Sequence, residues 1–228
     1  MSENILDKDP AADANMASML RGVLDKYMKS VDGMLPATVV SYNRTTNRAT
    51  VVPTINMVTT SGEALARAPY ANLPVLALGG GEFFINFPLK AGDTGWIEAS
   101  DRDISLWLQG AGTKTARPNT YRAHSFSDGR FIPDVLGNYT LADDADGAMV
   151  IQHKDGSTAV VISNEGVTIK AAQTVKIEAP NVEINAPQGI AMTGPVTSSG
   201  GMTIDGITFG THTHGGVQTG GSNTGGPQ

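Results

Sequence analysis

The stretch that decides the fold is residues 160–192, VVISNEGVTIKAAQTVKIEAPNVEINAPQGIAM. It repeats a short unit that begins and ends with an apolar residue. The five units are Val160-Val161-Ile162, Val167-Thr168-Ile169, Val175-Lys176-Ile177, Val182-Glu183-Ile184 and Ile190-Ala191-Met192, and their first residues are separated by seven, eight, seven and eight positions. Because residues two apart on a strand share a face, we expect each unit to send two side chains inward and one outward.

This period also predicts the oligomeric state. A single-chain β-helix needs roughly 20 residues per turn, whereas this repeat supplies one short strand and a corner. Such a strand cannot bury its apolar face alone, because ordering each residue costs about 1–2 kcal/mol. Three chains wound together would close an apolar axis and leave no sheet edge exposed. The repeat therefore predicts a homotrimeric, intertwined, triple-stranded β-helix or prism over residues 147–205. A β-sandwich is the alternative, and Pro180, Pro187 and Pro195 at the corners count against it.

Residues 1–34 predict an N-terminal helical segment. Apolar residues recur there at spacings of three and four, which places them on one helix face; they are Met16, Met19, Leu20, Val23, Leu24, Tyr27 and Met28. Asp13 or Asn15 could cap this helix. Two readings of the apolar face stay open: it packs on its own domain, or it docks onto a neighbouring subunit.

Residues 35–110 predict a small OB-fold barrel. A polar turn over 43–48 separates two apolar stretches, as in a β-hairpin. The expected strands are Thr38–Tyr42, Ala49–Pro53, Ile55–Thr59, Leu73–Leu78, Phe83–Phe87, Thr94–Ala99 and Ile104–Leu108. Five to seven short strands suit a closed barrel of the OB type, and the triple glycine 79–81 predicts a turn. Residues 111–146 predict a loop-rich connector. The whole chain is therefore expected to be mainly β.

Composition excludes several classes of function. The net charge is −6 with no basic run, which argues against a nucleic-acid-binding OB-fold. The chain has no cysteine, so disulfides and thiolate metal sites are excluded. No stretch approaches the ~20 apolar residues of a membrane span, and the acidic N-terminus lacks an apolar signal region. Asp101 and Asp103 could suggest a carboxylate pair, but solvated loop charges are the favoured interpretation, and we expect no enzyme activity.

Two histidines close to the C-terminus form the candidate metal site. His212 and His214 lie two apart between glycines, so on an extended chain their imidazoles project to the same side. On a three-fold axis three such pairs give six nitrogens in two stacked triangles, an octahedral arrangement. Neutral imidazole binds iron, nickel, copper and zinc, but structural zinc prefers four ligands. The site therefore favours iron or another octahedral ion. His124 and His153 stand alone and are expected to be structural or exposed.

Further stretches resemble the membrane-puncturing central spikes of contractile-tailed phages. The segments that resemble the OB-fold collar are Thr38–Pro53, Pro88–Trp96 and Ser100–Trp107, and 124–129 resembles the segment that follows the collar. The tail Thr211–Val217, ending in Gly225-Gly226-Pro227, is similar to the apex of that family. The resemblance implies an apex at residues 206–228 in which His212 and His214 of three chains hold one iron ion. The lysozyme domain of the larger spikes has no counterpart between collar and needle.

The function expected from the resemblance is mechanical. The trimer would sit on the baseplate hub at the end of the tail tube, with its tip meeting the host outer membrane, so the mature protein would belong to the virion after synthesis in the host cytoplasm. The absence of charged residues from the last 23 positions lowers the cost of entering a bilayer. A trimeric tail-fibre or adhesin shaft that binds a host surface receptor is the alternative. Such a tip would need exposed aromatic side chains, and none follows Phe209.

Overall fold

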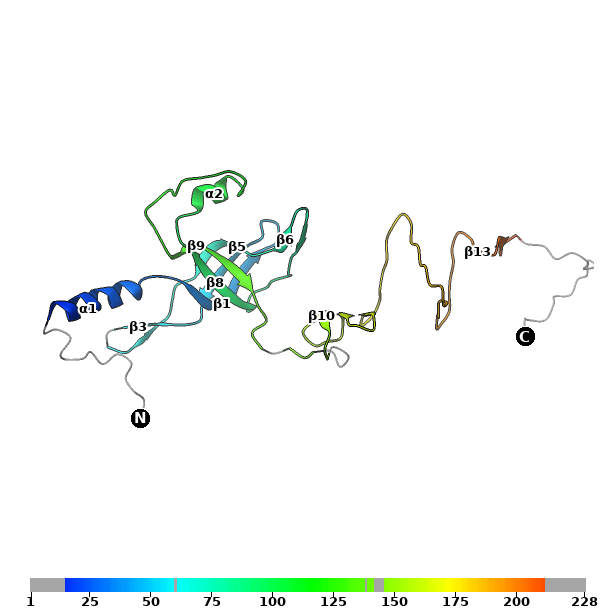
Figure 1. Cartoon of the computed structure of the whole chain (residues 1–228), viewed down its shortest axis with the longest axis horizontal. Helices are drawn as coiled ribbons and strands as arrows, with labels where there is room; N and C mark the ends of the chain where they lie inside the picture. Colours follow the sequence, from blue (N-terminus) through cyan, green and yellow to red (C-terminus); the bar gives the residue numbers. More distant parts are fainter. Residues whose placement is uncertain (1–14, 60, 138, 142–145, 212–228) are drawn as a thin grey trace, which may run out of the picture. The chain divides into compact units, whose positions relative to one another are not determined.

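The computed structural model describes residues 15–59, 61–137, 139–141 and 146–211. The chain divides into two units, residues 1–175 and 176–228. The fold is mainly β, as the sequence predicts, with two helices and 14 short strands in the described part of the chain (Figure 1).

Helix α1 (Met16–Met28) is the predicted N-terminal helix. It begins where expected, because the Oδ1 of Asn15 accepts a hydrogen bond from the backbone N–H of Ser18 at 3.0 Å, a side-chain cap. No residue of the helix is buried, and each of its seven periodic apolar side chains is at least 57% exposed. Packing of this face on the helix's own domain is therefore not observed in the described part of the chain. Docking onto a neighbouring subunit stays a prediction.

Five strands form a nearly closed barrel. The strands are β1 (Met34–Asn43), β2 (Arg48–Pro53), β5 (Tyr70–Pro74), β8 (Thr94–Ser100) and β9 (Ser125–Pro133), in the sheet order β5-β2-β1-β8-β9 with antiparallel pairing throughout. The two edges approach each other just after β5, where Val75 forms a parallel bridge with Phe131 and the Leu76 N–H donates to the Phe131 carbonyl at 2.8 Å. Five strands with this partial closure form a small barrel, as predicted, and the OB type of this barrel stays a prediction.

The barrel core consists of small aliphatic side chains around two phenylalanines. Phe126 and Phe131 are fully buried, together with Ile97 and Val51. A Cβ at Gly95 would overlap both the Phe131 ring and the Ile132 carbonyl oxygen, so only glycine lets β8 approach β9 here.

Two short hairpins extend from the barrel chain. The pairs are β3 (Met57–Val58) with β4 (Ala64–Leu65), and β6 (Leu78–Gly80) with β7 (Phe83–Ile85). The turn expected from the triple glycine falls on Gly81 and Glu82. Gly81 has φ +62° at the first loop position, as a type II′ turn requires.

Two predictions for the end of the barrel differ from the structure. The strand expected at Ile104–Leu108 is wrong, because helix α2 (Ser105–Gln109) occupies this stretch. A short apolar run fits a strand or a buried helix equally well, and here the Asp103 carboxylate binds the first N–H of the helix. The segment 111–146, expected to be a connector, contains β9, the last strand of the barrel.

The first units of the repeat lie in a three-stranded antiparallel sheet. It is formed by β10 (Met149–Gln152), β11 (Ala159–Ile162) and β12 (Val167–Lys170) in that order. In β11 the middle residue Val161 is buried while Ile162 is exposed, which is the reverse of the predicted alternation for this unit. Val161 is buried by residues of its own chain.

The second unit contains one hairpin in its described residues. Strands β13 (Thr203–Ile204) and β14 (Ile207–Thr208) are joined by Asp205 and Gly206. Both loop residues have positive φ, +49° and +79°, which is the type I′ turn typical of an Asp-Gly pair. The repeat units at 175–177, 182–184 and 190–192 form no strand in the single chain.

Candidate functional site

The described chain leads up to the predicted metal ligands. His212 and His214 lie outside the described residues, which end at Thr211. The hairpin β13–β14 precedes them and is extended by a hydrogen bond from the Phe209 N–H to the Met202 carbonyl at 2.9 Å. Among the described residues, no group of three or more histidines or carboxylates could hold a metal ion. The predicted site therefore depends entirely on the two terminal histidines and on the number of chains that supply them.

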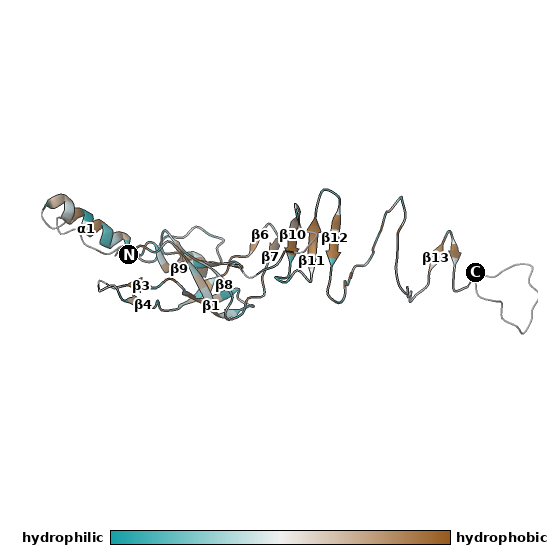
Figure 2. Ribbon diagram, turned by 90° about the horizontal axis from the view of Figure 1, so that it is seen from below, coloured by the Kyte–Doolittle hydropathy of each residue, from teal (hydrophilic) through white to brown (hydrophobic). Residues whose placement is uncertain are grey.

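The repeat exposes its apolar side chains. In Figure 2 the hydrophobic colour runs along β10, β11 and β12 and again at β13. The exposed set comprises Val167, Ile169, Val175, Ile177, Val182, Ile184, Ile190 and Met192, with Ile184 at 64%. Apolar side chains that recur along the sequence and stay exposed in the single chain are typical of an interaction surface. Nothing in the described part of the chain covers it.

Where the loop that holds α2 joins the barrel, the half-exposed Arg122 pairs with two buried carboxylates. Arg122 binds Asp128 through Nε at 3.0 Å and through a second guanidinium nitrogen at 3.0 Å, a bidentate pair. The same arginine lies 3.4 Å from Asp103, which also accepts from the Thr120 hydroxyl at 2.6 Å. Both carboxylates are buried. The cluster ties the start and the end of the 103–122 loop to β9.

This cluster corrects the interpretation of Asp101 and Asp103 as solvated loop charges. That reading holds for Asp101, whose side chain is 88% exposed, but it is wrong for Asp103. The buried carboxylate of Asp103 binds the backbone N–H of Ser105 at 2.9 Å, as well as Thr120 and Arg122. All three partners lie in the 103–122 loop, so Asp103 has the features of a structural group and not of a catalytic acid.

The environment of Asp103 favours its charged form. Hydrogen bonds from Ser105, followed by the one from the Thr120 hydroxyl, hold the pKa of the Asp103 carboxyl well below its usual range. Burial acts in the opposite direction, and the charge of Arg122 adds to the lowering. A carboxyl whose pKa is lowered by folding stabilises the folded state above its unfolded pKa of about 4.

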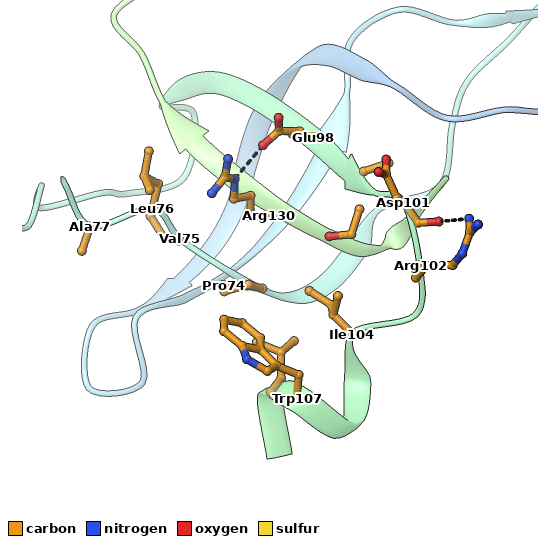
Figure 3. A pocket seen from close by; sticks show the side chains of 13 residues that line it. Pro74, Val75, Leu76, Ala77, Glu98, Asp101, Arg102, Ile104, Trp107 and Arg130 are labelled. Atoms are coloured by element: carbon orange, nitrogen blue, oxygen red, sulfur yellow. Dashed lines mark hydrogen bonds and ion pairs between the residues drawn. The ribbon is translucent and has the colours of Figure 1, made fainter. Parts of the chain in front are cut away.

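A groove lies between α2 and the barrel. It has a volume of about 710 Å³ and is bounded by Val75, Leu76 and Ala77 after β5, by the end of β8, and by Ile104, Trp107 and Leu108. Figure 3 shows the Trp107 ring and the Ile104 side chain turned toward Pro74. Gly112 lies close against the Trp107 ring, since a Cβ at Gly112 would lie 2.9 Å from it. Within the groove, Arg130 is paired with Glu98 at 2.6 Å.

The other histidines do not form a site in the described residues. The Nδ1 of His124 lies 3.7 Å from Asp101, and the Nδ1 of His153 lies 2.7 Å from Asp155 on an exposed turn. Sequence reasoning missed Arg122, Asp128 and Trp107. Nothing distinguishes Arg122 from other arginines in sequence, whereas Trp107 is one of only two tryptophans in the chain.

Two known protein families match separate parts of the chain. Residues 35–134, which contain the barrel from Leu35 in β1 to the end of β9, match the family described as phage protein Gp138 N-terminal domain. Residues 206–228 match the GpV Apex motif. The chain resembles phage baseplate central spikes. The resemblance inferred from the collar and tail residues is thereby confirmed.

The two family matches support a structural role for this chain in the phage baseplate. The two matches cover just over half of the 228 residues, and the second spans the residues expected to form the apex. Comparison with curated proteins finds no significant match. In the described part of the chain, neither helix has the length and apolar character needed to cross a bilayer.

Replacing Asp103 by asparagine should destabilise the barrel in a pH-dependent way. Its lowered pKa stabilises the folded state at neutral pH, and this contribution is lost as the pH falls below about 4 toward the folded pKa. We therefore expect Asp103→Asn to melt below the wild type at neutral pH, with the difference shrinking in acid. Asp101→Asn, at the exposed neighbour, should change little at any pH. A constant difference between Asp103→Asn and wild type across the titration would contradict the assignment.

Proposed function

We propose that three copies of this chain form the central spike of a contractile phage tail, which pierces the host outer membrane when the sheath contracts. The collar barrels would attach to the baseplate hub at the end of the tail tube. Residues 147–205 would wind into a trimeric β-helix, and residues 206–228 would form its apex. The observation that carries this proposal is the joining, in one chain, of a collar match and an apex match by an uncovered apolar repeat.

The uncovered repeat supports the trimer. Isolated two-stranded pairings are marginal in water, and the units from 175 to 192 form no strand within one chain. Burial of a valine or isoleucine side chain contributes roughly 1.5–3 kcal/mol, and this gain is available only if other chains supply the opposite walls. The repeat thus has most to gain from intertwined copies of itself.

The donor chemistry of the tip supports a metal ion. Each chain offers two imidazoles, His212 and His214, so three chains offer six. Neutral imidazole is a good ligand for iron and its neighbours in the transition series. When bound, the ion would cross-link three chain ends at the apex. His212 and His214 would hold it, and the flanking glycines would let three backbones approach.

A mechanical task suits these features. The closed β-helix would carry axial load through backbone hydrogen bonds that leave no free edge. The tip sequence from Gly206 to Gln228 contains no aspartate, glutamate, lysine or arginine, which lowers the cost of passing through hydrocarbon. No catalytic group is needed for this task.

A charge placed on the inner face of the repeat should break the trimer. Ile184→Lys would bury three unpaired ammonium groups around the axis, at a cost of roughly 3–5 kcal/mol per chain. Glu183→Lys makes the same side chain at the adjacent, outward position and serves as the control. We expect Ile184→Lys to lower the melting temperature strongly or to yield monomers, whereas Glu183→Lys stays trimeric. Equal behaviour of the two variants would contradict the inward assignment.

Elemental analysis of the purified protein tests the tip. We expect one metal ion per three chains, with iron as the expected element, and loss of that metal in the double variant His212→Ala/His214→Ala. The double variant His124→Ala/His153→Ala should retain it, since these histidines lie in the collar and on a turn. A wild type without metal, or one ion per chain, would rule out the axial site.

A further inference from the structure

The hairpin β6–β7 presents an apolar face that is exposed in the described part of the chain. Phe83 is 84% exposed, and the cross-strand pair Leu78 and Ile85 is exposed on the same face. On the opposite face Phe84 crosses over Gly79, where a Cβ would overlap the backbone of the facing strand. The glycines thus shape a thin hairpin with an aromatic residue directly beside its turn.

The groove under α2 offers a complementary surface. Its walls are mainly apolar, with Trp107, Leu108 and Leu76 among the lining residues, and charged side chains such as Arg102 and Glu98 also line it. Its volume of about 710 Å³ lies within the ~300–1,000 Å³ typical of sites for drug-sized ligands. No residue of the hairpin lines the groove of its own chain. Ala77, which lines the groove, is followed directly in sequence by Leu78 of the hairpin.

The charges at the two surfaces are also complementary. Glu82 stands at the tip of the hairpin and has no ion-pair partner among the described residues. Arg102 lines the groove, and among the residues that the structure describes its guanidinium binds only the backbone carbonyl of Asp101, at 2.8 Å. The other arginine of the groove, Arg130, is already paired with Glu98. Arg102 is therefore the groove cation left to receive an acidic partner.

We propose that the β6–β7 hairpin of each chain inserts into the α2 groove of a second copy, with Phe83 against Trp107 and Glu82 beside Arg102. The inference rests on the proposed trimer. A contact between two different patches repeats head to tail and closes a ring when the rotation is three-fold. Every copy carries both patches, so three hairpins fill three grooves and none is left exposed. The collar would then lock the trimer independently of the needle.

Single-cysteine variants of the full chain test this contact, because the natural sequence contains no cysteine. Phe83→Cys and affinity-tagged Leu108→Cys are co-expressed and oxidised mildly, and the tag identifies disulfides between chains. We expect a tagged–untagged heterodimer. Ser61→Cys, on the exposed turn of the β3–β4 hairpin, replaces Phe83→Cys as the control and should give little. In the cross-linking pair, Glu82→Arg should lower the yield about two- to fivefold, and adding Arg102→Glu should restore it.

The native mass of the same preparations separates the two claims. A trimer in which Phe83→Cys cross-links no better than Ser61→Cys overturns the hairpin contact and leaves the proposed spike standing. A trimer in which Glu82→Arg weakens the cross-link but Arg102→Glu does not restore it overturns the charge pairing. A protein that stays monomeric overturns both the contact and the proposed function.

Discussion

Burial of the apolar side of residues 160–192 is the constraint on which the rest depends. The side chains at the ends of its units are almost all exposed on a single chain, and the units from 175 onward have no pairing partner for their backbone. A sequence that repeats a strand and a corner every seven or eight residues cannot close a wall around itself. Further copies of the chain can supply the missing walls. Three chains together then offer six histidines, two from each C-terminal tail.

The collar barrel differs from the repeat, because it buries its hydrophobic core within one chain. Phe126 and Phe131 fill a barrel closed by β5 and β9, and the Arg122 cluster fixes the loop that carries α2. What the collar leaves exposed is local: the β6–β7 hairpin, the groove under α2 and the apolar face of α1. A self-folding collar with adhesive surfaces can bring three chains together before the repeat has formed any structure. Such an order would reduce the entropy cost of aligning three needles.

Sequence reasoning succeeded where local chemistry decides the structure. The cap at Asn15, the barrel strands β1, β2 and β8, and the turn at Gly81 follow from side-chain spacing and backbone freedom, and all are observed. It failed at Ile104–Leu108, where a five-residue apolar run carries no periodicity that separates strand from helix. It also failed at Asp103, because the partners that bury this carboxylate come from residues 17 and 19 positions away. The metal site stays a prediction, since it depends on histidines that only a multichain axis would bring together.

The mass of the intact assembly tests the account most directly. Native mass spectrometry or sedimentation equilibrium of the full-length protein should give three times the chain mass of 23.7 kDa at micromolar concentration, with no monomer at equilibrium. A stable, folded monomer under the same conditions would contradict the account, because the repeat would then leave its apolar side in water with nothing to offset the cost.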